Sequence, residues 1–247
     1  ALKMLAEEPA CTIITTFDGL MNPMPVPENF IQSVIKVVVG DTLNLEELVK
    51  HLVELGYEKN YQAETMGEFS VRGGILDIFP LTEDNPFRIE FWGDEVDSIR
   101  SFDAESQRSI ENLEEISIYP ACELVLTAEE RQEGIKRILK EADKVSAKLR
   151  KEMKTEEAHR TKSAAAQIAE EAGELGISAG LDAYLSYFCE ERVSLLDYFN
   201  RENTVIFVDE LARSIERGMV TETEYSESMK QRLEKGYILP GQMRELF

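Results

Sequence analysis

The sequence predicts an α/β protein in which a small, mostly antiparallel β-sheet is followed by long helices. Short apolar runs joined by glycine-containing turns lie between residues 67 and 102, as is typical of an antiparallel sheet. Apolar residues then recur every three or four positions from about residue 128 to 151, which is the spacing of one face of a helix. A chain of 247 residues is long enough for one large domain or two smaller ones.

The first 34 residues predict short elements that belong to a larger unit. Residues 2–8 fit one or two helical turns, and residues 11–16 form a β-rich run of the kind found in the middle of a parallel sheet. One such strand cannot form a sheet alone. After a proline-rich loop, residues 27–32 predict a helix that starts with proline, and residues 34–39 predict a second strand.

The next segment predicts one helix and then the sheet. Leucine and valine recur at helical spacing from residue 43 to 55, and Gly56 is a natural stop. Strands are predicted at residues 67–72, 75–80, 87–92, 96–102 and 116–119. The apolar positions switch from odd to even numbers across Gly73 and Gly74, so we expect these glycines to form a β-bulge that resets the buried face.

From residue 122 the chain is predicted to be mostly helical. Long helices are predicted at 128–151, 155–175 and 209–234, short apolar segments at 181–188 and 195–199, and a buried strand at 204–208. These changes of pattern divide the chain into three predicted parts, at residues 1–34, 35–121 and 122–247.

The composition limits the possible partners. The chain has 27 basic and 48 acidic residues and a net charge of −21 at pH 7, which argues against nucleic acid as a direct partner. Cys11, Cys122 and Cys189 are widely spaced and odd in number, so we expect buried thiols and no metal site. No apolar run approaches the roughly 20 residues that span a bilayer. We therefore expect a soluble cytoplasmic protein with no membrane partner.

One motif raises the possibility of an enzyme. The apolar run 204–208 followed by Asp209 and Glu210 has the form of a Walker B element, in which a carboxylate holds Mg²⁺. Alternatively, Asp209 caps the following helix and Glu210 lies in its first turn. The sequence contains no phosphate-binding loop of the form G-x-x-x-x-G-K-[ST]. We therefore expect no catalytic residue and no cofactor, and a truncated nucleotide hydrolase remains the alternative.

One face of the predicted sheet has the character of a docking surface. Strand alternation in residues 87–92 buries the apolar odd positions and exposes Arg88, Glu90 and Trp92. Arg72 is predicted to be exposed on the same grounds. Protein interfaces favour an exposed aromatic residue beside an arginine. The alternatives are a weak cross-strand ion pair for the arginines and a covered position under a loop for Trp92.

These residues resemble a known family. Residues 57–60, 69–80, 88–103, 106–108, 195–199, 209–210 and 236–240 resemble the UvrB-homology region of bacterial transcription-repair coupling factors (Mfd). The resemblance implies a degenerate helicase-like (RecA-like) α/β domain into which the β module is inserted. Residues 1–34 would be the end of a truncated first lobe, 35–121 the module that binds UvrA, and 122–247 a helical second UvrB-like part.

The resemblance also implies a function. A fragment of this kind would be a non-catalytic adaptor that recruits UvrA, a nucleotide-excision-repair subunit, to stalled RNA polymerase, whereas the full-length protein would be an ATP-dependent DNA translocase. The C-terminal module of the full-length chain could cover the UvrA-binding surface. UvrB tends to carry arginine where Lys59 stands. The positions that would contact UvrA are Arg72, Arg88 and Trp92, with weaker support for Lys59 and Glu90.

Two expectations about the surface follow from this reading. Glu90 would fix the position of Arg88 or meet a basic group of the partner. Arg88→Ala and Trp92→Ala would each abolish detectable association and leave the fold intact. Direct DNA binding through the Arg72 face is a third hypothesis, which the net charge of −21 disfavours.

Overall fold

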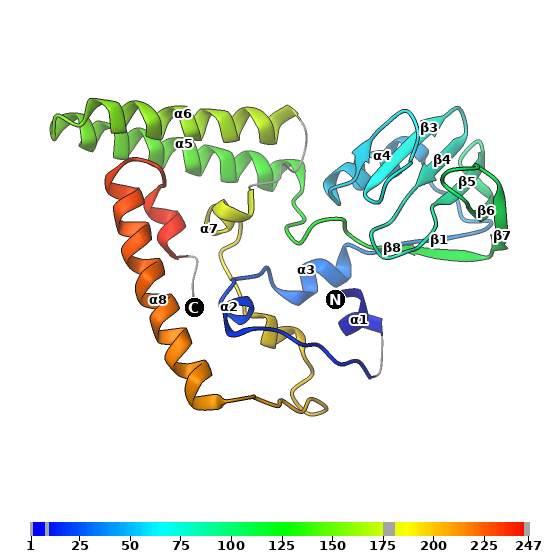
Figure 1. Cartoon of the computed structure of the whole chain (residues 1–247). Helices are drawn as coiled ribbons and strands as arrows, with labels where there is room; N and C mark the ends of the chain where they lie inside the picture. The colour runs from blue at the N-terminus through cyan, green and yellow to red at the C-terminus, as the bar shows by residue number, and fades with distance from the viewer. Residues whose placement is uncertain (1, 8–9, 175–180, 245–247) are drawn as a thin grey trace. The chain divides into compact units, whose positions relative to one another are not determined.

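The computed structural model describes residues 2–7, 10–174 and 181–244. The chain divides into two compact units. We call residues 28–125 the sheet unit, and residues 1–27 together with 126–247 the helical unit. Each unit is described by itself, and Figure 1 identifies the elements of both.

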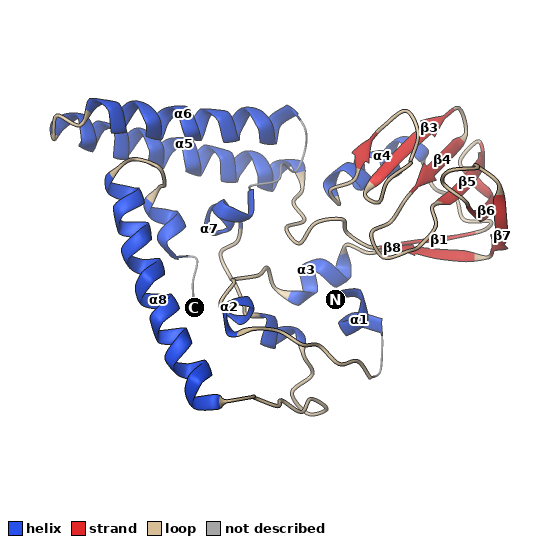
Figure 2. Ribbon diagram, in the orientation of Figure 1, coloured by secondary structure: helices blue, strands red, loops and turns tan. Residues whose placement is uncertain are grey.

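The sheet unit holds all eight strands of the described chain, and Figure 2 shows them gathered in it. The elements are α3 (Pro27–Gln32), β1 (Ile35–Val38), α4 (Leu45–Glu54), β2 (Glu58–Lys59), β3 (Glu68–Arg72), β4 (Ile75–Ile78), β5 (Phe87–Trp92), β6 (Glu95–Phe102), β7 (Ser109–Leu113) and β8 (Glu115–Ile118). Strands β2 to β7 form one sheet in sequence order, and β1 pairs with β8 in a second. Every pairing is antiparallel except β2 with β3. The prediction of a small, mostly antiparallel sheet is confirmed.

One face of the larger sheet forms the core of this unit. The helix α4 begins where the side chain of Asn44 accepts hydrogen bonds from the backbone of Glu46 and Glu47. It ends before Gly56, whose φ of +89° suits glycine. Fully buried side chains of the sheet and of α4 belong to one apolar cluster, which includes Leu52, Phe69, Leu76, Ile78, Ile89 and Ile99. The opposite face of the sheet is therefore left to polar side chains.

The expected bulge at Gly73 and Gly74 is wrong. The two glycines are the loop of a β3–β4 hairpin in which Arg72 pairs directly with Ile75. Gly73 has a φ of +62°, and a Cβ on Gly74 would meet the carbonyl oxygen of Phe91 at 2.8 Å. A two-residue loop pairs each odd position of one strand with an even position of the other, so the observed switch of parity needs no bulge.

The helical unit is built around two long antiparallel helices. Its helices are α1 (Leu2–Glu7), α2 (Phe17–Leu20), α5 (Ala128–Lys151), α6 (Thr155–Glu174), α7 (Leu185–Phe188) and α8 (Leu211–Glu234), with 3₁₀ turns at Leu181–Tyr184, Leu195–Tyr198 and Pro240–Arg244. Helices α5 and α6 lie side by side along their length (Figure 1). Their small and aliphatic residues pack with Tyr184, Tyr187 and Leu239.

The start of α5 follows a sequence rule closely. The hydroxyl of Thr127 accepts a hydrogen bond from the backbone of Glu130, and the carboxylate of Glu130 accepts one from the backbone of Thr127. This reciprocal arrangement is a capping box. The predicted bounds of α5 therefore agree with the structure at both ends.

Two predicted strands of the helical unit are wrong. Residues 11–16 and 204–208 have no strand structure, and Ile14 and Phe207 are each 93% exposed. A strand is stabilised by hydrogen bonds to a neighbouring strand, and no described segment pairs with either run. The apolar composition of these two runs is typical of a buried strand. Within the described residues, however, no strand pairs with either run.

The described residues also limit other readings. None of the described helices has the length and apolar character that crossing a bilayer requires. Within the same residues, no three histidine, cysteine or acidic side chains are grouped so that they could hold a metal ion. Cys11, Cys122 and Cys189 form no disulfide within the described residues and are only partly buried, so the expectation of buried thiols is wrong. Burial raises the pKa of Cys189 to about 11.

A candidate protein-docking surface on the sheet unit

The polar face of the larger sheet carries the candidate site. The register pairs Ser70 with Asp77, Asp77 with Arg88, and Arg88 with Arg100. These residues form a row across β3, β4, β5 and β6. Directly paired residues have side chains on the same face of a sheet. The row therefore lies on the face opposite the apolar core.

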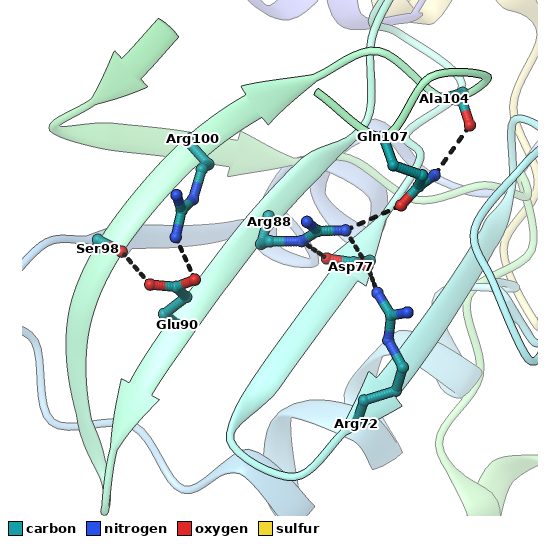
Figure 3. Close-up of polar contacts among 8 residues, drawn as sticks. All are labelled: Arg72, Asp77, Arg88, Glu90, Ser98, Arg100, Ala104 and Gln107. Atoms are coloured by element: carbon teal, nitrogen blue, oxygen red, sulfur yellow. Dashed lines mark hydrogen bonds and ion pairs between the residues drawn. The ribbon is translucent and has the colours of Figure 1, made fainter. Parts of the chain in front are cut away.

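Asp77 is the centre of this face. Its side chain is only 2% exposed, and both carboxylate oxygens accept hydrogen bonds from arginine. Oδ1 accepts from Nε of Arg88 at 2.6 Å, and Oδ2 accepts from Nη2 of Arg88 at 2.8 Å and from Nη2 of Arg72 at 2.6 Å. Figure 3 shows the two guanidiniums reaching the carboxylate from neighbouring strands. The contact with Arg88 is bidentate and the contact with Arg72 is a single hydrogen bond. Both are charge-assisted, the strong class of protein hydrogen bond, and they hold the two arginines in place.

Arg88 is more deeply set than strand alternation predicts. Its side chain is 17% exposed, its guanidinium lies 4.4 Å from the ring centre of Phe102, and its Nη2 also donates to Gln107 at 3.0 Å. Gln107 is held in turn by a bond to the carbonyl of Ala104 (Figure 3). The hydrogen bonds to Asp77 raise the pKa of Arg88. The expectation of a freely exposed Arg88 is therefore wrong, because most of its donors are already used.

Arg72 is the more accessible of the two arginines. Its side chain is 41% exposed, and within the described residues its guanidinium makes one hydrogen bond, to Asp77. One edge of the guanidinium is therefore fixed, and the other donors face outward. The prediction that Arg72 is exposed is confirmed.

Glu90 does not hold Arg88. Its carboxylate is hydrogen-bonded to the guanidinium of Arg100 and accepts a bond from the hydroxyl of Ser98 at 3.1 Å (Figure 3). Both charged side chains of this pair are about one-third exposed. The expectation that Glu90 fixes Arg88 is wrong, and Arg100 is the arginine that it binds.

Trp92 lies at the end of β5 with its side chain in solvent. It is 82% exposed. A shift of register between Glu90 and Phe91 precedes it, and Gly93, with a φ of +64°, turns the chain directly after it. The prediction of an exposed Trp92 is confirmed, and the alternative that it covers a second apolar cluster is wrong.

Lys59 is not part of this arrangement. The parallel register pairs it with Phe69, whose side chain points into the core. Lys59 therefore belongs to the opposite face from Arg72 and Arg88, at the open edge of the sheet. The structure brings together Arg72, Arg88, Glu90 and Trp92 on one face and leaves Lys59 out.

Sequence reasoning missed the acidic centre of the site. Asp77 lies within an apolar strand, where it draws little attention. Arg100, which binds Glu90, and Gln107, which accepts a hydrogen bond from Arg88, were also not named as site residues. The signal was present in the hairpin: a two-residue loop at Gly73 and Gly74 places Asp77 on the same face as Arg72.

The Walker B-like motif does not form. Asp209 and Glu210 are exposed and follow an irregular segment. Glu210 occupies the first position before α8 with a φ of +47° and no capping hydrogen bond from its side chain, which is paired with Arg213 at 2.9 Å. The alternative in which Asp209 caps the helix is also wrong. A largely open groove of about 510 Å³ lies along α8, and neither carboxylate lines it.

Comparisons with known proteins identify the domain that contains the sheet. Residues 35–124 match the family described as the UvrB interaction domain. The chain is 37% identical over 238 residues to the transcription-repair-coupling factor of Bacillus subtilis, which covers 96% of this chain and 20% of that protein. It is 38% identical over 189 residues to UvrABC system protein B of Fervidobacterium nodosum, covering 74% of this chain and 28% of that protein.

A further relative gives the same picture. UvrABC system protein B of Thermosipho africanus is 32% identical over 215 residues, which cover 85% of this chain and 32% of that protein. The chain thus spans a fifth to a third of the length of these relatives. It belongs to the family of proteins that carry a UvrB interaction domain, and over nearly its whole length it is a fragment similar to a transcription-repair-coupling factor.

Proposed function

We propose that the chain is a non-catalytic adaptor that binds UvrA through the polar face of its sheet and so brings UvrA to stalled RNA polymerase in the bacterial cytoplasm. The observation that carries this proposal is the 82% exposure of Trp92 on the same sheet face as an ordered group of arginines. Exposed aromatic residues next to arginine are enriched among the residues that dominate binding energy.

The network of Asp77 prepares the surface for a partner. Binding normally costs about 0.5–1.5 kcal/mol for each long side chain that becomes ordered. Arg72 and Arg88 are already held by a buried carboxylate. Much of their side-chain entropy is therefore lost on folding and not on binding. Arg72 would meet acidic or carbonyl groups of UvrA through its free donors, and Trp92 would provide the apolar anchor. Arg88 would act mainly by holding the network, and Glu90 with Arg100 would extend the charged surface.

The proposal includes an assignment of the parts of the chain. Residues 35–121 would be the UvrA-binding module, residues 1–34 the end of a first helicase-like lobe, and residues 122–247 a second UvrB-like part. In the full-length protein, its own C-terminal module would compete with UvrA for the same face. Lys59 would contribute little, because it lies on the opposite face.

Trp92 provides the test. It is the only tryptophan of the chain, and its fluorescence should shift to shorter wavelength when UvrA buries it. The same titration with a Trp92→Phe variant supplies the signal of UvrA alone, which is subtracted. ATP with Mg²⁺ should leave the emission unchanged. If calorimetry detects heat of binding with UvrA but the emission of Trp92 does not move, the partner is right and the surface is wrong. If neither changes, the proposed function is wrong.

A further inference from the structure

Helix α5 carries a row of lysines on its outward face. Lys140, Lys144, Lys148 and Lys151 follow one another at steps of four, four and three residues, and all are exposed. At 3.6 residues per turn they lie within about 80° of one another around the helix. The buried residues of α5, among them Ile138, lie on the other side. We call these four residues the lysine stripe.

The lysine stripe has no partner within the described part of the chain. None of its four amines makes a hydrogen bond or an ion pair there, whereas other lysines of the same hairpin do: Lys136 with Glu133, Lys154 with Glu152, and Lys162 with Asp143. The stripe is therefore a set of charges that the fold leaves unneutralised.

The acidic side chains of α5 near the lysine stripe bind other groups and do not pair with it. Residues 134–151 contain seven basic residues and only two acids, Glu141 and Asp143. Glu141 accepts hydrogen bonds from the hydroxyl of Tyr187 and from the backbone of Gly241 at 3.1 Å. Asp143 is paired with Lys162. In a chain with a net charge of −21, this face of α5 is a local reversal of sign.

The chemistry of the stripe favours phosphate over protein. Interfaces between proteins are depleted of lysine and rich in aromatic residues. Ala147 is the only exposed uncharged residue between Lys140 and Lys151. Lysine is a mobile point charge that binds phosphate without needing fixed geometry. The stripe is about 16 Å long, and duplex DNA carries one negative charge for about every 1.7 Å of its axis. Each lysine therefore has phosphates within reach.

We propose that the lysine stripe of α5 binds the phosphate backbone of duplex DNA without reading its sequence. This goes beyond the docking of UvrA, since the stripe belongs to the helical unit and UvrA docking to the sheet unit. It also departs from the expectation that net charge excludes nucleic acid. That expectation sums charges over the whole chain, but at physiological salt a charge is screened within roughly 8 Å. The local charge of the stripe decides what approaches it.

The test compares two variants of equal net charge. In the stripe variant, Lys140, Lys144, Lys148 and Lys151 are changed to glutamine. In the matched control, the paired lysines Lys36, Lys136, Lys154 and Lys162 are changed to glutamine. Glutamine has nearly the helix propensity of lysine, and circular dichroism checks that both variants are folded. Binding is measured by fluorescence anisotropy of a labelled 30-base-pair duplex.

Four phosphate contacts give a definite salt dependence. The unmodified chain should bind at 50 mM KCl with a dissociation constant on the order of 10⁻⁴ to 10⁻⁶ M and lose about 100-fold in affinity by 200 mM, a log–log slope of about −3.6. The control should behave in the same way, and the stripe variant should lose binding. Equal losses in both variants, or no binding of the unmodified chain at 50 mM KCl, would overturn the proposal. So would stripe-dependent binding to phosphatidylserine vesicles without binding to DNA.

Discussion

An Arg88→Ala variant is expected to lose about 2–3 kcal/mol of its free energy of unfolding, because Asp77 would be left buried with a single partner. Asp77 is 2% exposed, and Arg88 supplies two of the three hydrogen bonds that its carboxylate receives. Removing one member of a buried ion pair typically costs about 3–5 kcal/mol, and the remaining bond from Arg72 reduces that figure. Urea denaturation followed by circular dichroism measures the change.

Arg100→Ala is the matched control for this prediction. Arg100 is paired with Arg88 across the sheet and binds Glu90, but both members of its ion pair are partly exposed. Its loss should cost less than about 1 kcal/mol. A double variant of Asp77→Ala and Arg88→Ala should be more stable than the sum of the two single variants predicts, since no buried charge is left unpaired and Arg72, which loses Asp77, is 41% exposed. Substitutions at the surface usually change the free energy of unfolding by less than about 0.5 kcal/mol. If Arg88→Ala changes it by no more than that, the network does not stabilise the fold.

This prediction changes how binding data must be read. Strand alternation alone treats Arg88 as a surface residue whose removal leaves the fold intact. In the structure Arg88 is mostly buried and holds the site together through hydrogen bonds to Asp77 and Gln107. A loss of UvrA binding in Arg88→Ala would therefore combine lost contacts with a disturbed surface. Arg72→Ala has a smaller effect of the same kind, because Arg72 supplies one of the three hydrogen bonds to Asp77, so Trp92 gives the clean test.

The sequence was sufficient to predict which face of the sheet is polar. Side chains of a strand alternate strictly, so the apolar odd positions of β5 determine that Arg88, Glu90 and Trp92 share the other face. Alternation does not say how far a side chain lies from solvent. That depends on which residues of neighbouring strands are paired with it, and the register is set by the hairpin loops. Reading Gly73 and Gly74 as a loop would have placed Asp77 among the arginines.

In the helical unit, helices could be predicted from the sequence but strands could not. The bounds of α5 follow from a local capping box and a local apolar stripe, so they could be predicted well. The runs at 11–16 and 204–208 have the composition of buried strands, but a strand depends on a partner distant in sequence. No local pattern reports whether that partner is there.

Trp92→Ala should weaken binding to UvrA by about 2 kcal/mol or more, which is about 30-fold in the dissociation constant. The stability of the chain should stay within about 0.5 kcal/mol, because the indole is 82% exposed and contributes little to folding. This combination of a large loss of binding and no loss of stability separates a contact residue from a structural one. Calorimetric titration with UvrA and urea denaturation measure the two quantities on the same preparation.

Phe207→Ala is the matched control for Trp92→Ala. Phe207 is an aromatic residue with 93% exposure, and it lies in the helical unit. If general surface hydrophobicity were responsible for binding, both substitutions would weaken it equally. If the polar face of the sheet is the docking surface, Phe207→Ala binds UvrA normally and Arg72→Ala shows an intermediate loss, since one edge of its guanidinium is already committed to Asp77. The order Trp92, then Arg72, then Phe207 is the outcome that only this face of the sheet explains.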